Sequence, residues 1–560
     1  MSTLPWPVPS ALDARTQAFP FLSTAQINRL RPCGKLRRVE PGEILFQPDD
    51  TRVPFYVLLS GGMEIVQPDL TGERPIVTHG PGQFTGEITM ISGQRCLVRG
   101  RVTEAGEFLE ISPDGLRSIV AKDAELSEIF MRAFILRRLA LISHGLGNVI
   151  LMGSRHCANT LRLREFLSRN AHPYTYIDLD TDKTSQELLD RFEVKTNEVP
   201  VVICNGHTVL KNPTTQQLAD CLGFNVNIDS SQVRDLIIVG AGPSGLAAAV
   251  YGASEGLDTL VIENEAPGGQ AGSSSKIENY LGFPTGVSGQ ELSSRAIAQA
   301  QKFGAKMMVG HSVVRLDCKR RPYHVVLDNG STIAARAVVI STGAQYNKPP
   351  IANLKNFEGQ GIYYGATYIE SQLCESEDVV VVGGGNSAGQ AAVFLSQTAR
   401  KVYMLVRREG LSDTMSRYLI QRITDNPAIE LHCQTEITAL EGDRQLERVT
   451  WLDKASGETS THDIRHVFIM AGASPRTGWL QGCVALDDKG FILTGRDLDS
   501  SSIGSTLAWP LSRSPLMLET TLPSVFAVGD VRSGNVKRVA SAVGEGAIAV
   551  HLVHRALAEP

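Results

Sequence analysis

Two glycine-rich loops have the residue types and spacing of turns that hold dinucleotide phosphates. The first stands in DLIIVGAGPSGLAAAV, where an apolar run leads through GxGxxG into a helical pattern. Its candidate binding residues are Gly240, Gly242, Pro243, Ser244 and Gly245. The first glycine permits a sharp turn, the second lets the backbone approach a pyrophosphate, and the third lets helix and strand pack closely. Glu263 ends the next apolar run, where an acid hydrogen-bonds ribose hydroxyls.

The second loop stands in VVVVGGGNSAGQAA, and its candidate binding residues are Gly383, Gly385, Asn386 and Ser387. Alanine takes the third glycine position, which this kind of turn accepts. The following strand pattern ends in Arg407-Arg408. An acid there would repel the 2'-phosphate of NADPH, whereas guanidinium groups bind it. The loop therefore favours NADPH over NADH, and a solvated strand end is the alternative reading of the arginine pair.

A third candidate for chemistry is Cys157, which precedes a helical pattern in HCANTLRLREFL. A cysteine at a helix N-terminus has a lowered pKa and is a better nucleophile. The nine cysteines are scattered, at positions 33, 96, 157, 204, 221, 318, 374, 433 and 483, with no CxxC. This pattern is typical of reduced thiols, and we find no signal peptide, so we expect a cytoplasmic protein without a metal site.

The elements that position these residues form several units, because 560 residues are too many for one core. Residues 36–112 alternate apolar and polar side chains in short runs between turns, which predicts an antiparallel jelly roll closed by a helix over 124–143. Residues 148–225 alternate strand and helix patterns, including a helix over 184–192, which predicts a compact α/β unit. From Asp235 onward the chain reads as two βαβ dinucleotide-binding units, one inserted in the other.

Composition sets few limits on function. The net charge of -5 gives no electrostatic reason to expect nucleic acid or an anionic membrane. The most apolar stretches are interrupted by glycine and proline and fall short of a membrane span. We expect five segments, which are 1–147, 148–228, 229–345, 346–475 and 476–560.

Residues 235–560 resemble the thioredoxin reductase family nearly end to end. Three stretches are similar to the family's segments around the flavin: GGQAGSSSKIENYLGFP, AVVISTGAQ and VFAVGDVRSGNVKRVASAVGEGAIA. The resemblance implies FAD at the first loop, a Rossmann-like FAD domain with an inserted NADPH domain, and a homodimer. It places the following residues beside FAD: Gly269, Gln270, Asn279, Thr342, Gly343, Gly529, Asp530, Arg538, Val539 and Ala540. Asp530 would hold the ribityl chain. The family's HRR triplet is kept as VRR, and Arg417 is a candidate for a further arginine that is not matched.

The family's redox-active CATC is replaced here by GATY, which puts Gly365 and Tyr368 on the two cysteine positions. The family rotates its NADPH domain to alternate between reducing the flavin and reducing that pair. Neither replacement carries a sulfur. Tyr368 could stack on the isoalloxazine ring, as aromatic residues do in ferredoxin-NADP reductases, or it could be a packing residue. Cys374 is close in sequence, but it is single, and we expect it in a surface turn.

The middle unit resembles thioredoxin and glutaredoxin folds. CANT keeps the nucleophilic position at Cys157 and has Thr160 at the second cysteine position, and VPVV resembles the turn whose proline, here Pro200, is cis. A reductase with such a domain resembles the alkyl hydroperoxide reductase flavoprotein, although that family keeps CxxC in both parts. Cys157 could work through a mixed disulfide or a sulfenic acid, or CANT could be a relic turn of a docking domain. We expect Cys204 and Cys221 in the core of this unit.

The front unit resembles cyclic-nucleotide-binding domains, whose phosphate cassette runs from Gly-Glu through a short helix to an arginine. Gly86-Glu87 and Arg95 stand at these places, with a shorter spacing than usual. By this resemblance Glu87 would accept from a ribose hydroxyl and Arg95 would neutralise the phosphate. Domains of this type also lose their ligand, so nucleotide binding stays open. No DNA-reading winged helix follows, so we do not expect a transcription factor.

The sequence therefore predicts an oxidoreductase that transfers hydride from NADPH to FAD and passes electrons to an unknown protein or small-molecule acceptor, with possible gating by a cyclic nucleotide. Two alternatives remain. One is a thiol-disulfide reductase that acts through Cys157, and the other is a non-catalytic sensor of redox state or nucleotide.

Overall fold

The computed structural model describes most of the chain. It covers residues 16–559 apart from 70–71, 88, 93–94, 144–148, 182–197, 205–207, 226–228, 230, 444 and 500–508. The helix expected over 184–192 lies outside the described residues. No helix in the described part of the chain is long and apolar enough to cross a membrane.

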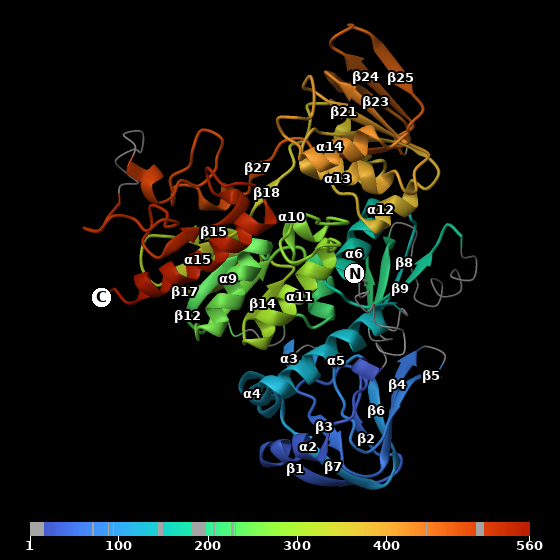
Figure 1. Cartoon of the computed structure of the whole chain (residues 1–560), viewed down its shortest axis with the longest axis vertical. Coiled ribbons are helices and arrows are strands. Elements are labelled where there is room, and N and C mark those ends of the chain that lie inside the picture. The colour runs from blue at the N-terminus through green and yellow to red at the C-terminus, as the bar shows by residue number, and fades with distance from the viewer. Residues whose placement is uncertain are drawn as a thin grey trace, which may run out of the picture.

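The front unit consists of two antiparallel sheets and two long helices, at the bottom of Figure 1. One sheet has the order β1 (Lys35–Val39), β7 (Gly106–Ile111), β3 (Phe55–Leu58). The other has the order β2 (Ile44–Phe46), β6 (Arg99–Glu104), β4 (Gly62–Asp69), β5 (Gly72–His79). Buried phenylalanines from both β-strands and helices form one core, because aromatic side chains bury large apolar areas. The helices are α4 (Pro113–Lys122) and α5 (Ala124–Ser143), so the helix predicted over 124–143 is confirmed.

The middle unit has one four-stranded sheet with the order β11 (Thr208–Lys211), β10 (Val201–Cys204), β8 (Val149–Gly153), β9 (Thr175–Asp178). Only β8 and β9 pair in parallel, and α6 (Ala158–Arg169) makes the crossover between them. α8 (Thr215–Cys221) follows β11. The expected alternation is confirmed for β8, α6, β9 and β10, whereas β11 and α8 were not predicted, and Pro200 is cis as predicted.

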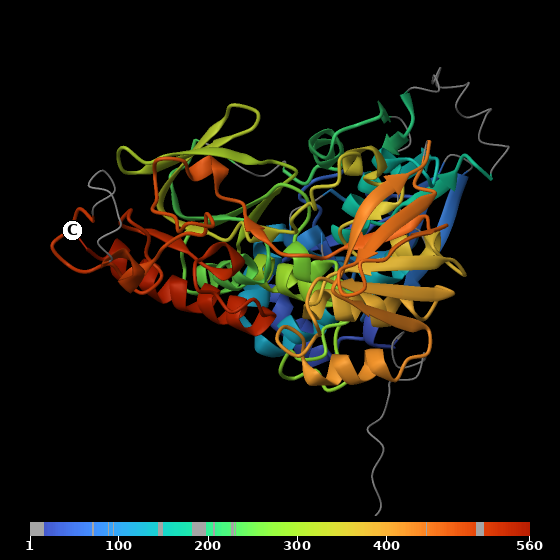
Figure 2. The ribbon, with the colours of Figure 1, turned by 90° about the horizontal axis from the view of Figure 1, so that it is seen from above.

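The FAD-type unit is built on a sheet in which β12 (Arg234–Val239) lies at the centre. The order is β14 (Lys306–Val309), β13 (Thr259–Glu263), β12, β17 (Thr332–Ile340), β16 (Tyr323–Leu327), β15 (Val313–Asp317), and β28 (Val525–Ala527) also pairs with β17. Its helices are α9 (Pro243–Ser254), α10 (Gly269–Gly272), α11 (Gly289–Lys302) and α15 (Val539–Leu557). Apolar faces of α9 and α15 share one core with the sheet. β28 and α15 return from the far end of the chain, so the unit is split as expected (Figure 2).

The inserted unit has a parallel sheet with the order β19 (Ile362–Tyr363), β26 (His466–Ile469), β20 (Asp378–Val382), β21 (Lys401–Val406), β22 (Ile429–Cys433). A separate antiparallel sheet contains β23 (Thr435–Glu441), β24 (Arg448–Asp453) and β25 (Thr459–His462). Its helices are α12 (Tyr368–Leu373), α13 (Asn386–Leu395) and α14 (Arg417–Thr424). Both dinucleotide-type loops therefore join a central parallel strand to a helix.

The expectation of nine reduced thiols is wrong for two of them. Cys318 and Cys483 form a disulfide that joins the two sequence segments of the FAD-type unit. The two residues are separated by 165 positions, and only the fold brings them together, so no local spacing could reveal the pair.

Candidate functional site

In the first glycine loop, between β12 and α9, no side chain of the loop covers the backbone at the N-terminus of α9. Gly240 has φ +101°, and a Cβ on it would lie 2.4 Å from the Ser341 carbonyl oxygen. A Cβ on Gly245 would lie 2.0 Å from the Gly240 carbonyl oxygen, so α9 packs directly on the turn. Gly242 is the N-cap of α9, and the nearest atom to a Cβ on it is 3.9 Å away. This cradle fits the pyrophosphate of FAD, which needs free N–H groups and no intervening side chain.

Glu263 lies beside this loop at the end of β13. Its Oε2 accepts from the Ala241 N–H at 2.8 Å, and its Oε1 accepts from the Glu265 N–H at 3.1 Å. Burial raises the pKa of Glu263, and the two N–H donors oppose that shift. A carboxylate has about four lone-pair directions, so Glu263 can hold the loop and also accept ribose hydroxyls.

The C-terminal segment meets the same loop. A Cβ on Gly529 would lie 2.5 Å from the Ser244 Oγ, so the Gly-Asp turn touches the first turn of α9. Burial raises the pKa of the neighbouring Asp530. The start of α15 holds the remaining predicted flavin residues, which are Arg538, Val539 and Ala540. The structure therefore brings together residues that the sequence separates by nearly three hundred positions.

Other predicted FAD residues connect the parts of this unit. The Gln270 Nε2 donates to the Ala344 carbonyl at 2.6 Å. Thr342 donates to the backbone of the second FAD segment at 3.0 Å, and no atom lies within 4 Å of a Cβ on Gly343. Asn279 lies in an exposed turn. Gln270 and Thr342 thus hold segments of the FAD-type unit together around the predicted site, whereas the backbone at Gly343 is accessible to a ligand.

The second glycine loop has the same construction. Gly383 has φ +141°, and a Cβ on it would lie 2.5 Å from a neighbouring carbonyl oxygen. Gly385 is the N-cap of α13, with no atom within 4 Å of a Cβ on it. The Asn386 Oδ1 accepts from the backbone of the α14 N-cap at 2.8 Å. Arg407 and Arg408 are exposed after β21, where guanidinium groups can reach a 2'-phosphate.

Tyr346 lies near residues of both loops and packs against the core of the inserted unit. Burial raises its pKa, the nearby Asp530 carboxylate raises it further, and Ser387 in the first turn of α13 opposes the shift. Arg422 of α14 forms an ion pair with Glu278 of the FAD-type unit. Tyr346 and the Arg422–Glu278 ion pair therefore link the inserted unit to the FAD-type unit, and Tyr346 lies close to both Ser387 and Asp530. Hydride transfer requires two bound cofactors to lie close together.

The GATY segment opens onto a cavity between three units. Thr367 is the N-cap of α12, and Tyr368 begins the helix with 69% of its side chain exposed. Tyr368 lines a cavity of about 420 Å³ together with the end of α6 and with Ser273 of the FAD-type unit. Its exposure argues against a role as a packing residue. Cys374, expected in a surface turn, is buried at the end of α12, because its thiol turns back toward the helix carbonyls.

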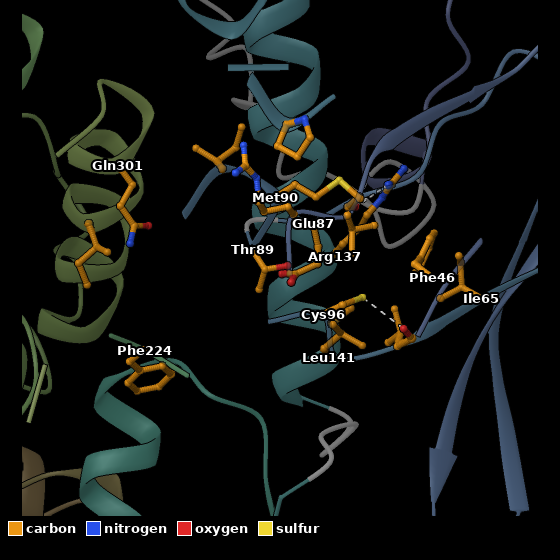
Figure 3. Close-up of a pocket in the computed structure, with 18 of the residues that line it drawn as sticks. Phe46, Ile65, Glu87, Thr89, Met90, Cys96, Arg137, Leu141, Phe224 and Gln301 are labelled. Atoms are coloured by element: carbon orange, nitrogen blue, oxygen red, sulfur yellow. Dashed lines mark hydrogen bonds between the residues drawn. The ribbon is translucent and has the colours of Figure 1, made fainter. Parts of the chain in front are cut away.

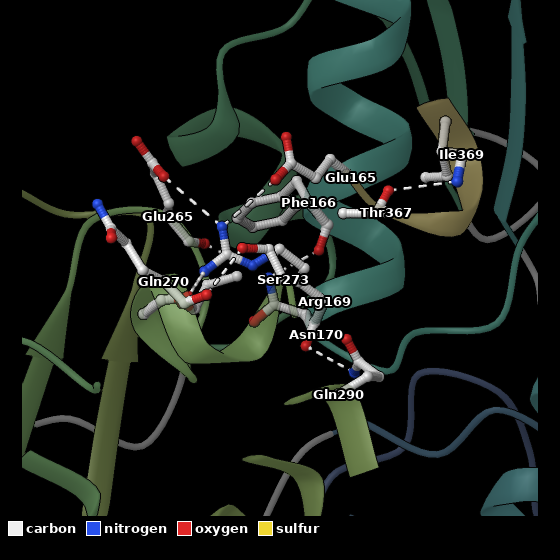
Figure 4. A network of polar contacts seen from close by, with 12 residues as sticks. Glu165, Phe166, Arg169, Asn170, Glu265, Gln270, Ser273, Gln290, Thr367 and Ile369 are labelled. Carbon is white, nitrogen blue, oxygen red and sulfur yellow. Dashed lines mark hydrogen bonds and ion pairs between the residues drawn. The ribbon is translucent and has the colours of Figure 1, made fainter. Parts of the chain in front are cut away.

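Cys157 is the half-buried N-cap of α6, whereas Tyr368 lines a cavity with residues of the C-terminal half of that helix. The next residue, Ala158, packs against Gly359 of the inserted unit, where a Cβ would lie 2.7 Å from the Ala158 Cβ. The other end of α6 is Arg169, which contacts the FAD-type unit (Figure 4). Twelve residues of helix span about 18 Å, so Cys157 and the flavin loop lie at opposite ends of α6. Cys204 is buried as expected, and Cys221 is half-buried beside it.

The front unit encloses a cavity of about 700 Å³ that extends to the FAD-type unit (Figure 3). Glu87 is 8% exposed, and among the described residues neither of its carboxylate oxygens has a hydrogen-bond partner. Arg137 of α5 lines the same space. Its Nε and Nη1 donate to backbone carbonyls, its Nη2 has no partner in the described part of the chain, and burial lowers its pKa to about 9. A ligand with hydroxyl donors and an acceptor or anion would satisfy both side chains.

Arg95 is directed away from that cavity, toward the middle unit. Its Nη1 donates to the Cys221 carbonyl at 3.4 Å and lies 3.8 Å from the Asp49 carboxylate. Its side chain packs on Gly223, where a Cβ would lie 2.5 Å from the Arg95 Nε. The arginine predicted to meet a phosphate is therefore an interdomain contact in this structure.

Sequence reasoning missed three residues: Arg137, Arg169 and Tyr346. A signal existed for Arg137, because two adjacent arginines interrupt the apolar run FILRRLAL, and a charge inside a buried helix needs a reason. Arg169 and Tyr346 had no comparable signal, since their partners lie in other units.

Comparisons with known proteins agree with this geometry. The family described as pyridine nucleotide-disulphide oxidoreductase matches residues 234–546, and the family described as cyclic nucleotide-binding domain matches residues 36–123. Thioredoxin reductase of Bacillus subtilis is 31% identical over 333 residues, which are 59% of this chain and 97% of that protein. Thioredoxin reductase of Mycolicibacterium smegmatis is 33% identical over 332 residues, with 59% and 98% covered. Among solved structures, Lactococcus lactis thioredoxin reductase in the FR conformation has a TM-score of 0.52 at 25% identity, covering 58% of this chain and 100% of that one. The T. acidophilum thioredoxin reductase has a TM-score of 0.51 at 28% identity, covering 58% and 99%.

Proposed function

Because the chain belongs to the pyridine nucleotide-disulphide oxidoreductase family, we propose that it transfers hydride from NADPH to FAD and delivers the electrons to an acceptor other than a disulfide beside the flavin. The observation that carries this proposal is the pair of glycine loops whose backbone is free of side chains at two helix N-termini, in a chain whose GATY segment has no sulfur. Bound FAD would supply the two-electron carrier between nicotinamide and acceptor.

The residues of the chain have separate tasks in this proposal. The N-termini of α9 and α13 hold the two pyrophosphates through backbone N–H groups. Glu263 orients the adenosine ribose of FAD, and Arg407 with Arg408 selects the 2'-phosphate of NADPH. Tyr346 packs against the core of the inserted unit and lies close to Ser387 and Asp530, so it would help to place the first turn of α13 relative to the flavin site.

The position of Cys157 favours a route that does not use this thiol. A thiol can attack or be reduced only within bonding distance of its partner. Cys157 stands at the opposite end of α6 from Arg169, which contacts the loop at Ala266 and Gly269, and the GATY segment has no thiol that could pass electrons from the flavin to Cys157. The acceptor classes that fit are a one-electron carrier, a quinone or oxygen, which need only access to the flavin.

Rapid mixing of the FAD-loaded protein with NADPH in the absence of oxygen tests the first half of the proposal. We expect loss of the oxidised flavin absorbance within seconds, and no loss would leave only the sensor alternative. Steady-state oxidation of NADPH with a quinone, oxygen, a ferredoxin or a thioredoxin then ranks the acceptors. Cys157→Ser should leave the quinone rate unchanged, and a loss of that rate would support the thiol alternative instead.

We further propose that the front cavity binds a cyclic nucleotide through Glu87 and Arg137. Both side chains are buried. The Glu87 Oε2 lies 3.7 Å from the Arg138 Nη1, but the Glu87 Oε1 and the Arg137 Nη2 have no hydrogen-bond partner in the described part of the chain, which favours a bound ligand. Calorimetric titration with cyclic AMP and cyclic GMP should give binding that Arg137→Met weakens at least tenfold, since a hydrogen bond to a charged group contributes about 1.5–3 kcal/mol. Arg95→Met is the matched control, and equal loss in both variants would contradict the assignment.

A further inference from the structure

The middle unit inserts one arginine into the loop that follows Glu263. Arg169, the last residue of α6, has a side chain that is 13% exposed. Its Nη2 donates to the Ala266 carbonyl at 3.1 Å and to the Gly269 carbonyl at 3.0 Å (Figure 4). Its Nη1 lies 3.8 Å from the Glu265 carboxylate. One guanidinium group therefore contacts three residues of a loop in another unit, which are Glu265, Ala266 and Gly269.

Further contacts hold the arginine and the loop in this position. Gln290 of α11 donates to the Arg169 carbonyl at 3.2 Å, and the neighbouring Asn170 donates to the Glu265 carbonyl at 3.4 Å. Glu165, one turn earlier on α6, lies 3.5 Å from the Arg169 Nη1. The guanidinium is thus oriented from both units, which reduces the entropy lost in each hydrogen bond.

The loop that Arg169 holds is part of the first dinucleotide cradle. Gly269 has φ +57°, and a Cβ on it would lie 3.0 Å from the Gly242 Cα, so the two backbones are in close contact. The Gly268 N–H donates to the Ala241 carbonyl at 2.7 Å, and the Ala241 N–H donates to Glu263. A displacement of Gly269 would therefore move both the turn at Gly242 and the carboxylate expected at the ribose.

We propose that Arg169 is a positioning residue for the adenosine and pyrophosphate half of FAD, supplied by the middle unit. It acts through the loop between Glu263 and Gly269 and holds that loop against the first glycine turn. The middle unit then completes the flavin site. This inference rests on the proposed FAD site, but it does not depend on the acceptor or on Cys157.

Equilibrium titration of the flavin-free full-length protein with FAD tests the proposal. Arg169→Met should weaken FAD binding at least tenfold, because two charge-assisted hydrogen bonds are lost. Binding of 2',5'-ADP, which carries the phosphate expected at the second loop, should change less than twofold. If Arg169 only supported the folded structure in general, the affinities for FAD and for 2',5'-ADP would fall together, and that result would overturn the proposal.

Two further variants make the test decisive. Arg162→Met is the matched control on the same helix, because Arg162 donates to the Pro213 carbonyl inside the middle unit, and it should leave FAD affinity within twofold. Arg169→Lys keeps the charge but has a single nitrogen in place of the Nη2 that donates to both carbonyls and the Nη1 that lies near Glu265, so we expect a loss of at least threefold. If Arg169→Met does not fold, Arg169→Lys decides, and FAD affinity equal to the parent's would refute the proposal. A failure of NADPH to reduce bound FAD would count against the proposed function and not against this inference.

Discussion

Leu161 offers a direct way to test how α6 joins the middle unit to the inserted NADPH-type unit. Its side chain is 8% exposed and belongs to the core cluster of the inserted unit, together with Tyr363, Ala366 and Ile369. Leu161→Ala removes apolar contacts from that shared core. Truncation of a buried leucine costs about 2–5 kcal/mol.

A loss near the lower middle of that range, about 3 kcal/mol, corresponds to a change of roughly a hundredfold in an equilibrium constant. The equilibrium affected is the local opening of α6 from the inserted unit, because Leu161 packs across that contact. Hydrogen exchange measured by mass spectrometry reports such opening segment by segment. We expect faster exchange in α6 and in α12, with no change in α9 and α15.

Leu163→Ala is the matched control on the same helix. Leu163 is fully buried in the core of the middle unit, so its truncation should speed exchange in β8 and α6 and leave α12 unchanged. The reasoning is refuted if Leu161→Ala leaves α12 as protected as in the parent, or if both variants affect α12 equally. The first outcome would mean that the crossing contact does not hold the units together.

Three other expectations follow from single side chains. Replacing Arg407 and Arg408 by alanine should raise KM for NADPH at least tenfold and leave KM for NADH unchanged, because a charged hydrogen bond contributes about 1.5–3 kcal/mol. An equal rise of KM for NADPH and for NADH would contradict selection of the 2'-phosphate. Burial lowers the pKa of His172 to about 3, so below about pH 6.5 the unfolded chain gains a proton that the native state does not. Chemical denaturation at several pH values measures the free energy of unfolding of the parent protein and of His172→Asn. From pH 6.5 toward pH 4 the parent's value should fall by about 1.4 kcal/mol per pH unit more than the variant's. If the two proteins show the same dependence on pH, the expectation is refuted. Cys204 and Cys221 lie side by side, and the interaction of their thiols raises the pKa of Cys204 and lowers that of Cys221. Iodoacetamide should therefore alkylate Cys221 first, as measured by peptide mass spectrometry, and the reverse order would contradict this pairing.

Local features of the sequence predicted the fold where structure depends on neighbours along the chain. The GxGxxG turn at Gly240 is of this kind, because the turn restricts its own backbone. The cis bond before Pro200 was predicted from the resemblance of VPVV to a thioredoxin-fold turn, whereas the cis bond before Pro322 had no such signal and was not predicted. Contacts between units could not be predicted in the same way. Arg95 occupies the place of a phosphate-binding residue, yet its partners are the Cys221 carbonyl, 126 positions away, and Asp49. A motif therefore predicted the position of this residue but not the direction of its side chain.

The arrangement of α6 bears on the absence of a sulfur pair at GATY. A reductase that alternates between flavin and an internal disulfide must turn its NADPH domain, and any helix fixed to both domains would oppose that motion. Here α6 contacts the FAD-type unit through Arg169 at one end and packs into the inserted unit through Leu161 near the other. Rotation would have to break both contacts, at a cost of several kcal/mol. In the proposed function no disulfide has to be brought to the flavin, so one fixed orientation of the two units would be sufficient. The contacts of α6 with both units agree with that proposal, because they oppose rotation of the inserted unit.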